Sequence, residues 1–210
     1  MKPTPITTPI GISSWCAINP DSPDTKFEHQ WFVDLILDPK DAKVQSFIAD
    51  AKKFYDDSRQ HFGAQLGTNP LPIKDELDAD KNPTGMIVVK CKRKVGGIRK
   101  DGSQWTNTLP VLYDANVQPF TPSGSIGKGS KMRIALNMKP YGAPKVGVTF
   151  EIVSVQILDV QYYGNDATPE AFEVEQGSNT PTPEVTHRKV TLTSPDSISG
   201  ASEGGDSFSF

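Results

Sequence analysis

The sequence predicts a mainly β domain with one α-helix, followed by a disordered acidic tail. Glycine and proline punctuate the whole chain, with 17 and 18 residues among 210, which is typical of many short strands and loops. Apolar residues alternate with period two in most segments between these breaks, and one segment has the period of a helix. No apolar periodicity persists after residue 163, where serine, threonine, glycine and acidic residues dominate. We therefore expect an N-terminal arm over residues 1–12, a β domain over 13–163 and a flexible tail over 164–210.

The β domain contains five or six predicted strands and one helix. The strands are expected at 12–18, 30–37, 86–95, 105–113, 128–141 and 147–163. The strand at 30–37 has apolar residues on both faces, which favours a central position. After it, Asp41 or Asp38 can cap a helix that ends at Gly63, and the apolar stripe of this helix is expected to be core. Residues 67–85 are predicted to be a polar, proline-broken connector, since their acidic residues do not match a calcium-binding loop.

Several function classes find no support in the sequence. No apolar run approaches the roughly 20 residues of a membrane span, and the N-terminus has no signal-peptide core, so we expect a cytoplasmic protein. Cys16 and Cys91 are far apart and are expected to be buried free thiols, and the three histidines are equally scattered. We find no catalytic triad, metal-ligand spacing or phosphate-binding loop. We therefore expect neither an enzyme nor a metal or cofactor site.

Charge is divided unevenly along the chain. Residues 164–210 hold eight acidic and two basic residues, a net charge of −6, which leaves +3 for residues 1–163. A basic body with an acidic tail is typical of a nucleic-acid surface joined to an interaction segment. The tail ends in Asp206-Ser207-Phe208-Ser209-Phe210. Two phenylalanines beside acidic residues resemble a docking peptide with apolar anchors.

Two predicted strands carry positive charge on one face. The strand at 86–95 places its lysines on one side by alternation, and a tryptophan opens the returning strand. The strand at 128–141 is basic on the face opposite Met132, Ile134 and Leu136, and it ends at a Pro-Tyr corner. In single-stranded nucleic-acid binding, cations follow the phosphates while bases stack on aromatic rings. The alternative for each strand is a solvated edge whose charges block aggregation, but two such strands favour a nucleic-acid interface.

The predicted elements fit a Greek-key barrel of the OB type, with the helix packed across one end. Such barrels bind oligonucleotides on one open face. The candidate nucleic-acid contacts are Lys131, Arg133, Lys139, Tyr141, Lys90, Lys92, Arg93, Lys94 and Trp105.

The order of several motifs carries a resemblance to a known family. These motifs are Phe32-Val33-Asp34-Leu35 leading through Asp38-Pro39-Lys40-Asp41 into the helix, Val89-Lys90-Cys91, the start Gly127-Lys128-Gly129-Ser130-Lys131-Met132-Arg133, the corner Lys139-Pro140-Tyr141, and the terminal Phe210. In this order the chain resembles the single-stranded DNA-binding proteins of T7-like bacteriophages, over residues 12–165 and the last residue.

The resemblance implies an OB fold, sequence-independent binding and annealing of single-stranded DNA (ssDNA), and a homodimer acting in phage DNA replication and recombination in the host cytoplasm. By position it implies DNA contacts at Lys131, Arg133 and Tyr141. It also implies that the tail, with Phe210 as its anchor, contacts the phage DNA polymerase and helicase/primase and competes with DNA. This tail is diluted by serine, threonine, proline and glycine, so its competition with DNA is expected to be weaker.

Two alternatives remain open from the sequence. A phage structural protein with a small β-sandwich would share the short strands and turns, but it would assemble into higher oligomers and ignore DNA. The same barrel could also bind RNA, because stacking tolerates either sugar.

Overall fold

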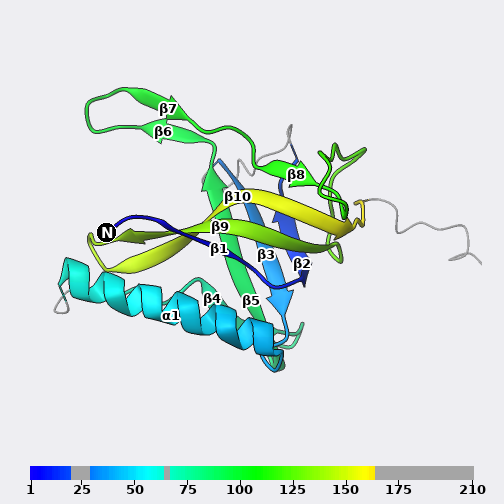
Figure 1. Ribbon diagram of the computed structural model, residues 1–210, viewed down its shortest axis with the longest axis horizontal. Coiled ribbons are helices and arrows are strands. Elements are labelled where there is room, and N and C mark those ends of the chain that lie inside the picture. Colours follow the sequence, from blue (N-terminus) through cyan, green and yellow to red (C-terminus); the bar gives the residue numbers. More distant parts are fainter. Residues whose placement is uncertain (20–28, 64–66, 164–210) are drawn as a thin grey trace, which may run out of the picture. The chain divides into compact units, whose positions relative to one another are not determined.

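The computed structural model describes residues 1–19, 29–63 and 67–163. The predicted tail at 164–210, including Asp206, Phe208 and Phe210, lies outside the described residues. The described strands are β1 Thr4–Thr7, β2 Gly11–Ala17, β3 Gln30–Leu37, β4 Ile73–Leu77, β5 Pro83–Lys94, β6 Gly96–Ile98, β7 Gln104–Thr106, β8 Val111–Tyr113, β9 Lys131–Tyr141 and β10 Gly147–Asp159, and the helix is α1 Ala42–Phe62 (Figure 1).

Five of the strands close into a barrel. Around the barrel the order is β2, β3, β5, β10 and β9, and β9 pairs back to β2. The β5–β10 pair is parallel, whereas the other four pairs are antiparallel. This closed Greek-key circuit confirms the predicted OB-type barrel.

Alternation along the strands builds the core. In β3, Trp31, Val33, Leu35 and Leu37 are buried, and in β9 every second residue from Met132 to Met138 is buried. Because successive side chains point to opposite faces of a strand, the residues between them face outward, including the basic residues of β9. The predicted two-faced character of the strand at 128–141 is therefore confirmed.

The helix covers the side of the barrel away from the β6–β7 ribbon (Figure 1). Asp41 caps it, with the side chain accepting from the Lys43 backbone N–H at 2.7 Å, and Gly63 follows its last residue. Its buried stripe contains Val44, Phe47, Ala51 and Phe54, and the Phe47 ring meets Phe150 of β10 edge-on at 5.9 Å. The helix boundaries and its core face match the sequence prediction.

Three segments differ most from the sequence prediction. The arm predicted at 1–12 contributes β1, which pairs with β9, and the predicted boundary at residue 12 falls within β2. The connector predicted at 67–85 contains β4, which pairs with β5 through a turn that the Asp78 carboxylate stabilises. The single strand predicted at 105–113 is two short strands, because β7 pairs with β6 in a separate ribbon whereas β8 joins β10.

Both cysteines are free and buried, as predicted. Burial raises the pKa of Cys16 to about 11, against a smaller lowering effect of its hydrogen bond with Ser13. The pKa of Cys91 is also raised, by burial and then by the negative charge of Asp34. Since the thiolate is the reactive form of cysteine, both side chains are inert parts of the core.

A buried serine hydroxyl stabilises the turn at the start of β9. Gly129 occupies the turn with a φ of 93°, a conformation that glycine adopts without strain. The next residue, Ser130, is fully buried, and its Oγ donates to the Gly127 carbonyl at 3.0 Å and accepts from the Gln161 backbone N–H at 2.9 Å. The glycine and serine of the Gly-x-Gly-Ser motif therefore have structural roles, in the turn and in the hydrogen bonds at the start of β9.

We expect Ser130→Ala to lower the free energy of unfolding by about 1–3 kcal/mol, because the Gln161 N–H loses its acceptor in a partly buried site. Urea denaturation measures this change. Ser46→Ala, at an exposed position of α1, is the matched control and should be close to neutral. An equally stable Ser130→Ala variant would show that the hydroxyl is dispensable.

Candidate nucleic-acid interface

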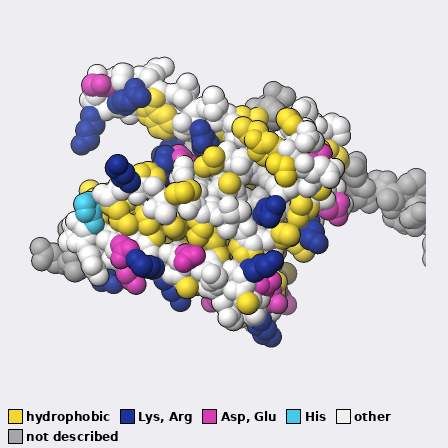
Figure 2. All heavy atoms as spheres, in the orientation of Figure 1, with side chains coloured by type: hydrophobic (Ala, Val, Ile, Leu, Met, Phe, Trp, Pro, Cys, Tyr) yellow, Lys and Arg dark blue, Asp and Glu magenta, His cyan; other side chains and the backbone are white. Residues whose placement is uncertain are grey.

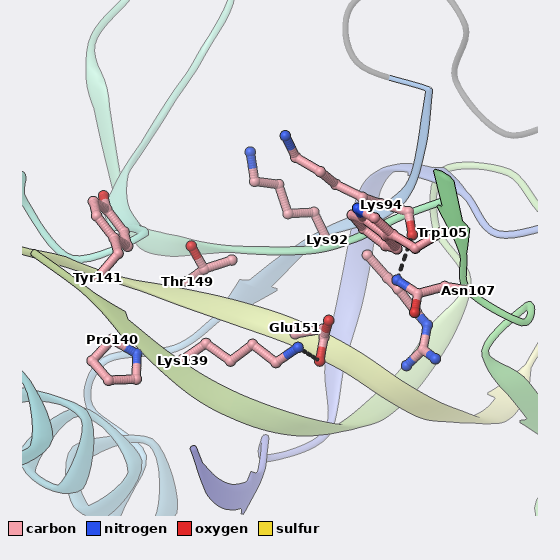
Figure 3. A pocket seen from close by; sticks show the side chains of 10 residues that line it. Lys92, Lys94, Trp105, Asn107, Lys139, Pro140, Tyr141, Thr149 and Glu151 are labelled. Atoms are coloured by element: carbon pink, nitrogen blue, oxygen red, sulfur yellow. Dashed lines mark hydrogen bonds and ion pairs between the residues drawn. The ribbon is translucent and has the colours of Figure 1, made fainter. Parts of the chain in front are cut away.

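The outer faces of β5, β9 and β10 meet at a groove of about 400 Å³ beneath the β6–β7 ribbon. The residues lining it are Lys92, Arg93, Lys94, Trp105, Asn107, Lys139, Pro140, Tyr141, Thr149 and Glu151. Figure 3 shows Lys92 and Lys94 extending side by side, with Tyr141 on the other side of the groove. Figure 2 shows Lys and Arg side chains on the ribbon and on the part of the barrel next to it.

Strand register places the basic residues of the groove. In β5, Ile87, Val89 and Cys91 are buried, so Lys90, Lys92 and Lys94 face outward on the same strand. Glu151 of β10 is in register with Lys92 on one side and with Asn137 of β9 on the other. The groove therefore runs across neighbouring strands.

Acidic side chains pair with lysines on this surface. Glu151 binds Lys139 at 2.5 Å, and its side chain is 15% exposed against 45% for the lysine. Asp34 of β3 binds Lys90 at 3.1 Å. These carboxylates hold the two ammonium groups in place. They also occupy the side of each ammonium group that a phosphate would otherwise bind.

The ribbon brings an aromatic side chain to the groove. Among the described residues β6 and β7 pair with each other alone, and Trp105 of β7 lies opposite Gly97 of β6. A Cβ on Gly97 would lie 3.1 Å from the indole, so glycine lets the ring pack closely on the ribbon. The side chain of Asn107 then donates to the Lys94 carbonyl at 2.8 Å, which holds the base of the ribbon against β5.

Tyr141, the last residue of β9, forms the opposite end of the groove. A Cβ on Gly147, its partner in β10, would clash with the ring, so the ring rests directly on that glycine backbone. The hydroxyl accepts from the Asn69 side chain at 3.1 Å. The Tyr141 side chain is therefore fixed by these contacts, while the residue remains partly exposed to solvent.

The structure brings six of the nine predicted contacts together and separates three. Lys92, Arg93, Lys94, Trp105, Lys139 and Tyr141 line the groove. Lys90 lies beside it in an adjoining depression. Lys131 is exposed at the start of β9, eight residues from Lys139, which is about 27 Å along a strand.

Arg133 and Arg93 already have protein partners. The Arg133 Nε donates to the Gln156 side chain at 2.6 Å, and Arg133 lines a separate depression with Thr7 and Tyr113. Arg93 has the same strand parity as the buried Cys91, and its Nη1 donates to the Ile152 carbonyl at 3.1 Å. Arg93 therefore ties β5 to β10 at the edge of the groove.

Sequence reasoning missed Asn107, Thr149 and Glu151. Each is polar and common, and no local pattern distinguishes them from other solvated strand residues. Only the pairing of β10 with both β5 and β9 places Thr149 and Glu151 in the groove.

Comparison with solved structures supports this fold assignment. The chain is similar to gp2.5, a single-stranded DNA-binding protein encoded by bacteriophage T7, with a TM-score of 0.58 and 19% identity over 86% of this chain and 100% of the other. It is also similar to the single-stranded DNA-binding protein of bacteriophage Enc34 in complex with ssDNA, with a TM-score of 0.55 and 16% identity over 76% of this chain and 89% of the other. The chain has the fold of these phage proteins. No family model matches the sequence, and no curated protein matches it either.

The phage OB fold gives the groove a defined place on the barrel. OB folds bind oligonucleotides on the face of their second and third strands and the adjoining loops. In this chain those strands are β3 and β5, and Lys90, Lys92 and Lys94 lie on that face.

In the part of the chain that the structure describes, the helix is not apolar enough to cross a membrane, and no three His, Cys, Asp or Glu side chains are grouped as metal ligands.

The Lys139–Glu151 pair leads to a prediction about affinity. We expect Glu151→Gln to raise the affinity of the groove for a polyanion such as oligo-dT a few-fold, because Lys139 then meets phosphate without competition from a carboxylate. Titration at fixed ionic strength measures the change. Asp159→Asn removes the same charge from an exposed position of β10 and is the control. An equal gain in both variants would assign the effect to net charge.

Proposed function

We propose that this protein binds single-stranded DNA without sequence preference. The observation that carries the proposal is the convergence of Lys92, Lys94 and Lys139 with Trp105 and Tyr141 around one groove. The groove adjoins the face on which OB folds bind oligonucleotides. The structures of two phage single-stranded DNA-binding proteins, one of them in complex with ssDNA, have the same fold.

The chemistry of the groove favours a single strand. The lysines follow the phosphates and release counterions, so affinity falls as salt rises. The two aromatic rings offer stacking surfaces, and stacking tolerates any base because every base has a π-face. A duplex hides these faces inside its stack, so it can use the lysines but not the rings.

Intrinsic tryptophan fluorescence tests the proposal. The protein is titrated with oligo-dT, duplex DNA and oligo-U, each across a salt series. We expect saturable quenching by oligo-dT that weakens steeply with salt, and weak quenching by the duplex. Stronger binding of oligo-U would instead indicate an RNA-binding protein. No response to any ligand would favour the phage structural-protein alternative, built on this closed barrel and not on a β-sandwich, and higher-order assembly in solution would support it.

The wider role that we propose is protection and annealing of ssDNA during phage DNA replication and recombination, by a homodimer in the host cytoplasm. In this proposal the acidic tail, with Asp206, Phe208 and Phe210, contacts the phage DNA polymerase and helicase/primase. The net charge of −6 after residue 163 supports competition between the tail and DNA for the basic groove.

Deletion of residues 196–210 tests the tail. We expect the deletion to tighten ssDNA binding, because it removes acidic residues, and to abolish polymerase or helicase contact in a pull-down. Unchanged affinity together with unchanged partner binding would contradict the proposed tail function.

A further inference from the structure

An exposed pair of aromatic rings lies outside the groove described above. Trp15 of β2 is 56% exposed, although tryptophan usually contributes a large apolar area to protein cores. Its ring meets Phe32 of β3 edge-to-face, with centroids 5.5 Å apart and an interplanar angle of 82°. Phe32 therefore fixes the indole, while more than half of the Trp15 surface stays open to solvent.

The backbone explains why Trp15 faces outward. Regular alternation would bring Trp15 to the same face as the buried Ser13, but the β2–β3 register shifts between Ser13 and Trp15. After this irregularity Trp15 is paired with Asp34, whose side chain binds the outward Lys90. The bulge therefore places the Trp15 side chain on the outer surface and not in the core. Bulges that redirect a side chain in this way are common next to functional sites.

The depression around Trp15 is continuous with the groove. It is lined by Trp15, Gln30, Phe32, Asp34, Lys90, Cys91 and Lys92, and Lys92 also lines the groove. Strand register gives the same continuity, because one lateral row joins Phe32 of β3 to Lys92 of β5, and Lys92 to Glu151 of β10.

We infer that the Trp15–Phe32 pair is a second base-stacking subsite for the same DNA strand. The inference rests on the proposed function. Lys90 and Lys92 next to the rings give this surface the cationic and aromatic composition that single-stranded nucleic acid recognises. The strand would cross the barrel from β2 to β9, with phosphates near Lys92 between the two aromatic ends.

The dimensions of the barrel set the length of DNA required. Four steps between neighbouring strands separate β2 from β9 along this path, roughly 19 Å of lateral distance at the usual spacing of strands. Tyr141 lies a further four residues, about 14 Å, along β9 from Asn137, where the lateral row meets that strand. Sites of about 4–16 nucleotides are typical of one OB fold. An oligonucleotide at the short end of this range is expected to use the lysine-rich groove, whereas a longer one reaches both ends.

The three tryptophans make the two ends separately observable. Trp31 is 5% exposed in the core, so we expect it to be insensitive to ligand. Trp105→Phe leaves Trp15 as the responsive residue, and Trp15→Phe leaves Trp105. In the Trp105→Phe variant, we expect oligo-dT of about 12 nucleotides to quench Trp15 and oligo-dT of about 4 nucleotides to quench it much less.

Affinity provides a second measurement. We expect Trp15→Leu to weaken binding of the longer oligo-dT by about 5- to 150-fold, the effect of losing one stacked base. The shorter oligo-dT should lose less than about 2-fold, and Trp15→Phe should restore most of the affinity for the longer one. Val111→Ala alters a side chain of similar exposure (50%) on β8 and should leave both affinities unchanged.

The outcomes separate this inference from the proposed function. If the native protein binds no oligo-dT, both are wrong. The second subsite alone is wrong if the native protein binds oligo-dT but the longer oligo-dT quenches Trp15 no more than the shorter one, and Trp15→Leu weakens binding of the longer oligo-dT no more than binding of the shorter one. The Trp105→Phe titration decides the question even if Trp15→Leu fails to fold.

Discussion

Replacement of Lys92, Lys94 and Lys139 by alanine is expected to weaken ssDNA binding by about 100-fold at 0.1 M salt. Each phosphate contact on a single strand contributes about −0.7 to the slope of log K against log salt. Loss of three contacts should therefore flatten the slope by about 2. The three lysines line one groove, so the strand meets all of them together. Titrations over a salt series give both quantities.

The matched control removes three lysines elsewhere. Lys40, Lys43 and Lys52 are exposed on α1 and the turn before it, and their triple alanine variant has the same net charge as the groove variant. We expect this control to change affinity only slightly, because exposed charges beyond about 10 Å are largely screened at 0.1 M salt. Equal losses in the two variants would show that overall charge, and not the groove, attracts DNA.

Local periodicity was sufficient to predict the barrel strands and the helix. The alternation in β9 and β5 reflects one buried and one solvated face, which a single strand encodes by itself. The helix carries its own cap at Asp41 and its own stop at Gly63. β4 escaped prediction because Ile73–Leu77 is a short edge strand rich in charge, and its pairing comes from the longer β5.

The site could be predicted only in part, because strand parity gives a face but not its neighbours. Arg133 and Lys139 share the outward face of β9, yet six residues separate them, about 20 Å along the strand. Which of the two joins Lys92 depends on the registers of β9 and β5 with β10. Trp15 faces outward because of a bulge, and an alternation rule assigns such a residue to the wrong face.

The groove combines charges that attract DNA with carboxylates that weaken the attraction. Glu151 and Asp34 each hold a lysine of this surface, and phosphate must compete with them. Such pairs keep the lysines ordered before binding. In the proposed function they also lower the affinity for ssDNA, because a phosphate has to displace a carboxylate from each lysine.

Replacement of Tyr141 by leucine is expected to weaken ssDNA binding by about 1–3 kcal/mol, the usual contribution of one base stacked on an aromatic ring. The charge of the protein is unchanged, so the salt slope should stay the same, in contrast to the lysine variant. Tyr141→Phe keeps the ring and loses only the hydrogen bond from Asn69. It should therefore bind ssDNA within a few-fold of the native protein.

The position of Tyr141 on Gly147 requires a stability control, because the ring also covers the backbone of β10. Thermal unfolding of each variant shows whether the barrel remains folded at the temperature of the titration. Tyr113→Leu changes the same side chain in the separate depression beside Arg133 and should not alter ssDNA affinity. A Tyr141→Leu variant that stays folded and binds as tightly as the native protein would assign Tyr141 to packing alone. The stacking contribution of the groove would then come from Trp105.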